Sequence, residues 1–159
     1  MVNLLRSDTQ SARTMITGLA LILGLVGLGG CIAQPSFAPG ARDPDAPSAF
    51  TQTESGLKYR ILRKSDGEKP TVSSRVKVHY VGTLDDGSEF DSSYRRGEPA
   101  AFALSGVVPG WTEGLQLVGE GGMIELEIPS ALGYGPAGMP GAIPPNATLH
   151  FIVELLEIQ

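Results

Sequence analysis

The strongest constraint on the fold of this chain is a two-residue alternation of apolar and polar side chains from residue 57 onward. Val76, Val78 and Tyr80 alternate with Lys77 and His79, which is the pattern of a strand with one buried face. The same alternation occurs in residues 57–61, 123–128 and 148–158. Each of these four segments is therefore predicted to be a strand of a sheet that is apolar on one side.

Turn signals connect these segments and favour antiparallel pairing. The strand over 76–80 is followed by Asp85-Asp86-Gly87-Ser88, and Asp-Gly is favoured in tight hairpin turns. Residues 89–92 would then return beside that strand, and residues 101–104 would form another short strand. The sequence thus predicts about five strands, mostly antiparallel.

One segment changes from a strand period to a helix period. Trp111, Leu115 and Val118 are spaced i, i+4 and i+7, which places them on one face of a helix. Pro109 suits the first turn, and the glycines of residues 119–122 end the segment. Because a half-apolar sheet must be covered and only one amphipathic helix is available, the predicted fold is α+β, with the sheet curved around one short helix.

Chain length, charge and cysteine content narrow the class of protein. A chain of 159 residues has room for one ordinary domain with appendages. The formal net charge is −5, and no run of Lys or Arg follows the phosphate-binding pattern, so nucleic acid is not an expected partner. Cys31 is the single cysteine, which excludes a disulfide within one chain. No nucleophile triad or metal-ligand motif is present, so neither a cofactor nor a metal is expected.

Residues 1–30 have the pattern of a signal peptide for a lipoprotein. Arg6 and Arg13 precede an apolar run over residues 15–28, as in secretory leaders. The run ends in Leu28-Gly29-Gly30-Cys31, which resembles the bacterial lipobox, in which the cysteine is lipidated and becomes the mature N-terminus. Two alternatives remain: a retained membrane helix over 15–33, whose length approaches a span, and a cysteine that is incidental to ordinary signal cleavage.

Residues 31–52 are predicted to be a tether between the anchor and the domain. The segment contains Pro35, Pro39, Pro44 and Pro47 and has no periodic apolar face. Such a composition buries too little apolar surface to offset the entropy of ordering, and prolines favour extended stretches. The folded domain is then expected over residues 53–159, in a lipoprotein that faces the periplasm or the cell exterior.

Three groups of residues in this domain resemble one known family. They are Val78-His79-Tyr80-Val81-Gly82 through Phe90-Asp91-Ser92-Ser93, then Val107-Val108-Pro109-Gly110-Trp111-Thr112-Glu113-Gly114-Leu115, then Leu132-Gly133-Tyr134-Gly135 through Ile143-Pro144-Pro145-Asn146-Ala147-Thr148-Leu149. In this order they are similar to the FK506-binding-protein (FKBP) type of peptidyl-prolyl cis/trans isomerase. The resemblance covers residues 53–159 and implies a half-barrel sheet wrapped around a short helix, in agreement with the fold predicted from periodicity.

The resemblance also implies a proline-binding pocket. Its floor would be Trp111, and the backbone N–H of Val108 would bind a substrate carbonyl. Asp91 and Tyr134 would supply its polar groups and act in catalysis with Trp111 and Phe90. The implied substrate-binding residues are Tyr80, Phe102, Val107, Val108, Ile143 and Phe151, with Phe90 as a further wall residue. The implied partners are proline-containing polypeptides.

The sequence departs from the family pattern at three positions near this pocket. Ala100 occupies an aromatic wall position, with Phe102 close by. Met139 stands where a histidine is frequent, and Ala142, beside Ile143, stands where an isoleucine is frequent. These changes would open one side of the pocket, so sequence preference and macrolide affinity do not follow from the resemblance.

Two other functions are compatible with the same residues. Taken singly, Tyr80, Phe90, Phe102 and Phe151 are typical core residues, and Trp111 at a helix start is typical of packing. One alternative is a proline-peptide-binding or chaperone-like module without catalysis, and another is a lipoprotein that binds small ligands. Family members that dimerise often do so through long N-terminal helices, and residues 34–50 have no helical apolar stripe, so a monomer is expected.

Overall fold

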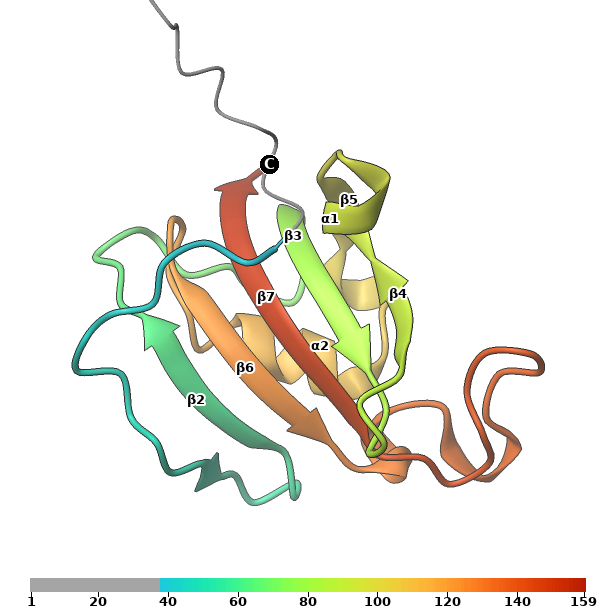
Figure 1. Cartoon of the computed structure of the whole chain (residues 1–159). Helices are drawn as coiled ribbons and strands as arrows, with labels where there is room; N and C mark the ends of the chain where they lie inside the picture. Colours follow the sequence, from blue (N-terminus) through green and yellow to red (C-terminus); the bar gives the residue numbers. More distant parts are fainter. Residues whose placement is uncertain (1–37) are drawn as a thin grey trace, which may run out of the picture. The chain divides into compact units, whose positions relative to one another are not determined.

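The computed structural model describes residues 38–159. The predicted signal peptide (1–30), Cys31 and the first part of the predicted tether lie outside the described residues. The described part is built on one sheet, which Figure 1 shows in front of its principal helix.

All strands within residues 38–159 belong to a single antiparallel sheet with the order β1-β2-β6-β7-β3-β4, and β5 pairs with β3. The strands are β1 (Thr51–Gln52), β2 (Lys58–Arg63), β3 (Arg75–Thr83), β4 (Glu89–Ser92), β5 (Ala100–Ala103), β6 (Met123–Ile128) and β7 (Leu149–Ile158). The predicted α+β class and antiparallel sheet are confirmed, with seven strands instead of about five. The two-residue strand β1 is too short to show an alternation.

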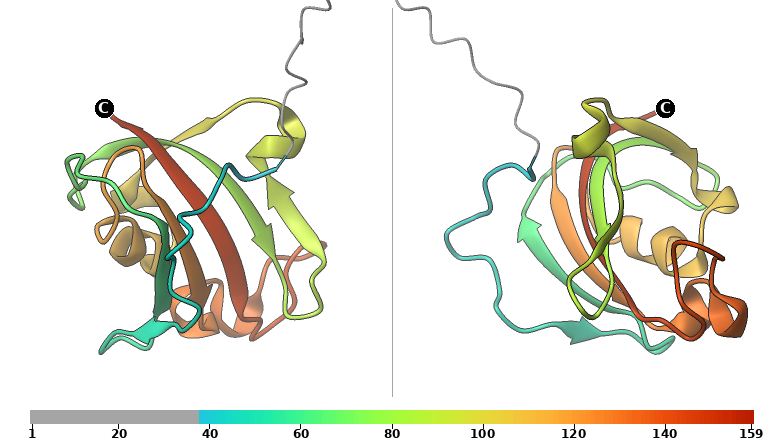
Figure 2. Two further views of the ribbon diagram at one scale, coloured as in Figure 1. Left: turned by 60° about the vertical axis from the view of Figure 1, so that its left-hand side comes forward. Right: turned by 45° about the vertical axis from the view of Figure 1, so that its right-hand side comes forward.

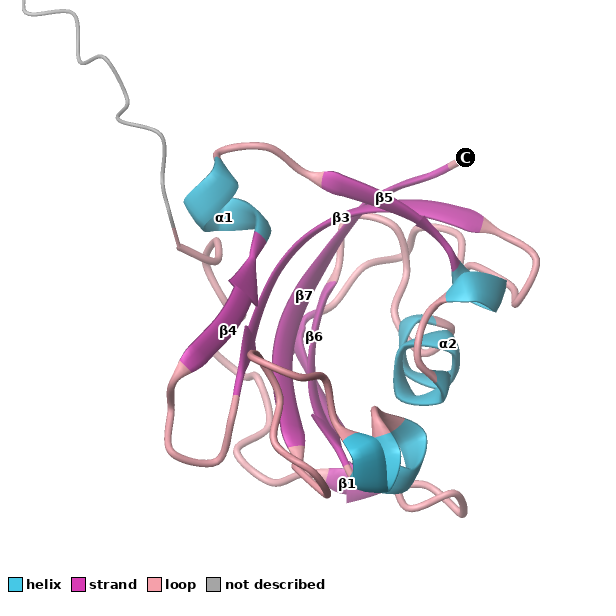
Figure 3. Cartoon of the chain, turned by 90° about the vertical axis from the view of Figure 1, so that its right-hand side faces the viewer, coloured by secondary structure: helices cyan, strands magenta, loops and turns pink. Residues whose placement is uncertain are grey.

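The sheet curves around the helix α2 (Pro109–Leu115), which lies on its concave side (Figure 3). Ile124, Leu126 and Ile128 of β6 are fully buried on that side, as the alternation predicted. The helix lies close to β6 because Gly114 faces Leu126: a Cβ at Gly114 would be 2.7 Å from Leu126 Cδ2. Trp111 also packs into this core.

The helix is shorter than the spacing of its apolar residues suggested. It ends at Leu115, and Val118 is buried in the turn that follows. The glycines after it allow that turn, and Gly121 has a φ of 84°, which other residues rarely adopt. The predicted apolar face is thus buried, although its last member lies outside the helix.

Several short helical turns complete the domain. They are α1 (Ser93–Arg96) and the 3-10 turns η1 (Leu104–Gly106), η2 (Ser130–Leu132) and η3 (Gly135–Ala137). The Ser92 side chain accepts a hydrogen bond from the Arg95 N–H, and Gly97 ends α1 in the left-handed region. Both contacts are typical helix caps. A helix of one turn has no apolar period, which is why α1 was not predicted.

Residues 40–52, here called the strap, cross the convex face of the sheet, on the side opposite α2 (Figure 2). The Asp43 N–H donates to the Leu62 carbonyl oxygen at 2.7 Å, and β1 pairs with β2. The Arg60 guanidinium lies 4.8 Å from the centroid of the Phe50 ring. The sequence assigned residues 40–52 to the tether, but in the structure they contact the domain through backbone hydrogen bonds and through the Arg60 guanidinium. Contacts of these kinds leave no periodic pattern of apolar residues in the sequence.

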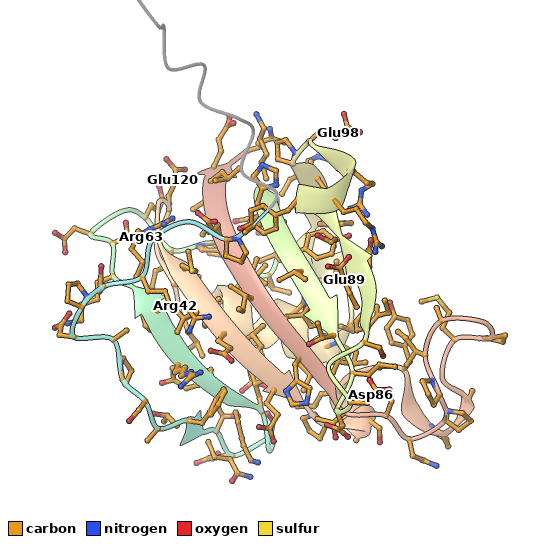
Figure 4. The ribbon with its side chains drawn as sticks, in the orientation of Figure 1. Arg42, Arg63, Asp86, Glu89, Glu98 and Glu120 are labelled. Carbon is orange, nitrogen blue, oxygen red and sulfur yellow. The ribbon has the colours of Figure 1, made fainter. Side chains whose placement is uncertain are left out.

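The strap begins at a buried carboxylate of β7. Glu154 is 8% exposed, and it accepts hydrogen bonds from the Gly40 N–H at 2.7 Å, from Arg63 Nη2 at 2.8 Å and from the Tyr94 hydroxyl. Arg63 lies where the strap passes the turn at residues 119–122 (Figure 4), and its Nε donates to the Gly121 carbonyl at 3.0 Å. The strap, β2 and α1 thus meet at one acidic side chain of β7.

Candidate functional site

A cavity of about 470 Å³ opens beside α2 on the concave side of the sheet. It is lined by Tyr80, Phe90, Asp91, Phe102, Gly106, Val107, Val108, Trp111, Tyr134 and Phe151. Of the ten pocket residues predicted from the sequence, every one except Ile143 is in this set. The sheet, η1, α2 and the loop after β6 all contribute to its wall.

Aromatic rings form the base of the cavity. Trp111, 4% exposed, is surrounded by the rings of Tyr80, Phe102 and Phe151, whose centroids lie 5.2, 5.6 and 5.2 Å from its own and whose planes are nearly perpendicular to it. Edge-to-face packing of this kind is favourable for aromatic quadrupoles and holds the rings in fixed orientations. The Trp111 Nε1 has no hydrogen-bond partner among residues 38–159. The result is a rigid and apolar floor.

The width of the cavity depends on a glycine in β3. Phe90 and Phe151 are in edge-to-face contact at 5.4 Å, and both rings lie over Gly82. A Cβ at Gly82 would be 2.6 Å from Phe90 Cζ and 2.7 Å from Phe151 Cε1, closer than real Cβ contacts. Any other residue here would displace the two rings toward the cavity or away from the sheet.

The polar side of the cavity is a network of three side chains. Asp91 accepts hydrogen bonds from the Tyr80 hydroxyl and from Arg96 Nη1, and Arg96 Nη2 donates to the Tyr80 oxygen at 2.9 Å. Partial burial would raise the pKa of Asp91, but the bonds from Tyr80 and Arg96 outweigh it and hold that pKa below its ordinary value. Burial, assisted by Asp91, raises the pKa of Tyr80 to about 12. At neutral pH the carboxylate is ionised and the phenol is protonated.

The side-chain partners of Asp91 are Tyr80 and Arg96, and Tyr134, the other polar residue of the predicted pocket, does not contact it through a hydrogen bond. The sequence-based interpretation missed Arg96, which the one-turn helix α1 brings back toward Asp91. The sequence did contain a signal for this helix: Ser92 is a residue typical of a helix N-cap, and basic residues follow in the last turn. The Tyr80 hydroxyl, which already donates to Asp91, has no proton left for a ligand.

Besides the buried Trp111 Nε1, donors at the rim of the cavity also lack protein partners within residues 38–159. The Val108 N–H at the start of α2 and the Tyr134 hydroxyl have no hydrogen-bond partner among the described residues. Tyr134 is 37% exposed, so a ligand can reach it from solvent. The cavity therefore combines an apolar floor with donors on its rim that can bind the carbonyl groups of a peptide.

Ile143 lies outside this cavity, contrary to its predicted role as a wall residue. It is buried in the core, 4% exposed, and its N–H and carbonyl pair with the backbone of Met139. Both residues line a separate hollow of about 510 Å³, together with Leu84, Ala137, Pro140, Gly141, Ala142, Pro144 and Pro145. Ala100 pairs with Val78 across the sheet, and Phe102 takes the aromatic place in the cavity wall.

Within residues 38–159, no three His, Cys, Asp or Glu side chains gather where they could hold a metal ion. In the same range, no helix has the length and apolar character needed to cross a membrane.

Comparison with known proteins identifies the family to which this chain is similar. Residues 66–156 match the family model of the FKBP-type peptidyl-prolyl cis-trans isomerases. Over 107 residues, the chain is 55% identical to the Escherichia coli K12 protein named FKBP-type peptidyl-prolyl cis-trans isomerase FkpA, an alignment that covers 67% of this chain and 39% of that protein. It is 53% identical over 106 residues to the 22 kDa FKBP-type isomerase of the same organism, with 67% and 52% covered.

Solved structures have the same fold. The crystal structure of FkpA from Escherichia coli superimposes with a TM-score of 0.69 and 51% identity, covering 71% of this chain and 53% of that one. A peptidyl-prolyl cis-trans isomerase from Pseudomonas syringae gives a TM-score of 0.66 and 35% identity over 71% and 83% of the two chains. The aligned part spans well under two thirds of FkpA.

Proposed function

This chain belongs to the FKBP-type peptidyl-prolyl cis-trans isomerases, and we propose that it accelerates rotation about Xaa-Pro bonds in exported polypeptides. The observation that carries the proposal is the cavity of about 470 Å³, whose apolar floor is bordered by unpartnered donors. A prolyl ring fits an aromatic floor, and the carbonyls on either side of it are acceptors for those donors.

The reaction requires no bond to be broken. Rotation about the Xaa-Pro bond crosses a barrier of ~18–20 kcal/mol because the twisted amide loses resonance, and it takes tens of seconds or longer without a catalyst. The twisted amide also has less charge separated between oxygen and nitrogen than the planar one. A dry aromatic cavity therefore disfavours the transition state less than water does, which is how a binding site accelerates a reaction.

The donors would hold the chain while the bond turns. In our proposal, the Val108 N–H binds one substrate carbonyl and the Tyr134 hydroxyl binds a second. A peptide fixed on one side of the proline can rotate only on the other side, so orientation removes part of the entropic barrier. Removing ~6–7 kcal/mol in total would accelerate rotation about 10⁵-fold.

Asp91 would act through its charge. Arg96 and Tyr80 hold the carboxylate in one position at the cavity wall, so its field on a bound prolyl amide is fixed before binding. A preorganised charge stabilises a changing dipole without reorganisation during the reaction. Trp111 and Phe90 would contribute shape and the exclusion of water.

The location of this activity is a further part of the proposal. Cys31 follows Leu28-Gly29-Gly30 and an apolar run, which supports a lipid anchor at the mature N-terminus, outside the cytoplasmic membrane. The lack of a helical apolar stripe over residues 34–50 supports a monomer. Replacement of Cys31 with Ser should release the protein from membranes or block its processing. An unmodified Met1 by mass spectrometry, together with a variant that stays in the membrane fraction, would favour a retained helix instead.

The activity can be tested with a peptide isomerisation assay and with proline-limited refolding. Wild-type protein should accelerate both, while Asp91→Ala should lower turnover and leave peptide binding largely intact. Glu98→Gln is a matched control because Glu98 is exposed and lies outside the cavity lining. A wild-type protein that binds proline peptides without accelerating rotation would replace the enzyme with a binding module.

A further inference from the structure

A third concavity, a hollow of about 480 Å³, adjoins the cavity at Val107. Its lining consists of Val72, Ser105, Val107, Pro109, Thr112, Glu113 and Gln116. Val107 also lines the first cavity, so one valine forms the ridge between the two. A polypeptide that enters the first cavity can cross this ridge without leaving the protein surface.

The lining of this hollow combines three apolar side chains, Val72, Val107 and Pro109, with one carboxylate, Glu113. Val72 is 53% exposed, an unusual fraction for a large aliphatic residue of this domain. Glu113 accepts a hydrogen bond from the Ser55 hydroxyl at 2.6 Å, and among the described residues no Lys or Arg forms an ion pair with it.

Two other polar side chains of the hollow, Thr112 and Gln116, already donate hydrogen bonds to the protein, and the Ser105 hydroxyl is a neutral group. The Thr112 hydroxyl donates to the Leu104 carbonyl oxygen at 2.6 Å, and Gln116 Nε2 donates to the Thr112 carbonyl oxygen at 2.7 Å. A visiting side chain therefore encounters the apolar surface of Val72 and the uncompensated charge of Glu113. A Lys or Arg side chain matches both, because its aliphatic stem packs on apolar surface while its cation stays at the edge.

We propose that this hollow is a specificity subsite that accepts a basic residue next to the proline of the substrate. The inference rests on the proposed isomerase function, in which the Val108 N–H binds a substrate carbonyl. A residue whose carbonyl is held there lies beside Val107. Because an extended chain advances ~3.3–3.6 Å per residue, one or two further residues reach Glu113. The protein thus prefers proline segments that carry Lys or Arg within two positions of the proline.

The test measures kcat/KM for matched proline peptides that carry Lys, Gln or Glu at each position within two residues of the proline. The full chain, kept in solution by a mild detergent, is compared with Glu113→Gln and Glu113→Lys. Ser55→Ala serves as a control that removes the hydrogen bond to Glu113 but keeps its charge. Glu68→Gln serves as a control for an exposed carboxylate outside the lining of the hollow.

At one or more positions, wild-type protein should prefer Lys over Glu by about two- to fivefold at low salt, the range of a partly exposed ion pair. Glu113→Gln should abolish this preference, Glu113→Lys should reverse it, and both controls should retain it. Added salt should weaken it in the wild type.

Two failures are distinguishable. Equal rates for the Lys, Gln and Glu peptides at every position, or a preference that survives in Glu113→Gln and Glu113→Lys, would overturn the subsite while leaving the isomerase function in place. Absence of acceleration for every peptide would instead overturn the proposed function on which the subsite rests.

Discussion

Replacement of Glu154 with Gln is expected to destabilise the domain more than any loss of exposed charge would. The carboxylate accepts three hydrogen bonds, from Gly40, Arg63 and Tyr94, and its residue is 8% exposed. A glutamine has the same shape but only one oxygen. If that oxygen faces Gly40 and Tyr94, the amide NH₂ faces the Arg63 guanidinium, and two donors oppose each other.

The magnitude follows from the bonds that are lost. A hydrogen bond to a charged group contributes about 1.5–3 kcal/mol, and a buried charge that loses its partner costs about 3–5 kcal/mol. Arg63 is partly exposed, with 27% of its side chain accessible, so water can replace part of the loss. We therefore expect a decrease of about 2–3 kcal/mol in the free energy of unfolding, or about 8–12 °C in melting temperature.

Urea denaturation of residues 38–159 measures this effect, with Glu157→Gln as the control. Glu157 pairs with Lys77 at 3.5 Å and its side chain is 51% exposed, so its replacement should change stability by less than about 0.5 kcal/mol. Equal stabilities for the two variants would refute the assignment of Glu154 as the attachment point of the strap.

The pH dependence provides an independent check. Burial raises the pKa of Glu154, but the bonds from Tyr94, Gly40 and Arg63 outweigh it, and the pKa in the folded state is lowered. A carboxylate whose pKa is lowered on folding contributes its full stabilisation above its pKa in the unfolded chain, which is about 4.3. This contribution is lost as the pH falls through the pKa of the folded state. The difference in free energy of unfolding between the wild type and Glu154→Gln should therefore be constant near neutral pH and decrease below about pH 4.

Three other changes separate packing from catalysis. Trp111→Ala should lower stability by about 3–5 kcal/mol and weaken peptide binding, measurable by denaturation and titration; an unchanged affinity would remove Trp111 from the binding floor. Asp91→Ala should reduce turnover severalfold with a melting temperature close to that of the wild type, and full activity would exclude a catalytic charge. Gly82→Ala should displace the rings of Phe90 and Phe151 and raise KM; a crystal structure with both rings unmoved would contradict the close approach.

The local elements of the fold could be predicted because each is encoded by its own side chains. The alternation over Met123–Ile128 coincides with β6, and the change of period at Pro109 marks α2. The family resemblance, in turn, identified nine of the cavity residues, because their order and spacing along the chain match the motifs of the family. Periodicity alone could not have separated them from the core, since a pocket floor and a core residue both require apolar side chains.

The contacts between elements were decided by tertiary structure. Arg96 reaches Asp91 only because a one-turn helix reverses the chain after β4. Gly40 and Glu154, 114 residues apart, meet because β7 lies in the middle of the sheet and the strap crosses its convex face. Sequence periodicity shows which face of an element is apolar, but the partner of a polar group depends on strand order. That order is a property of the whole sheet, and no single segment contains it.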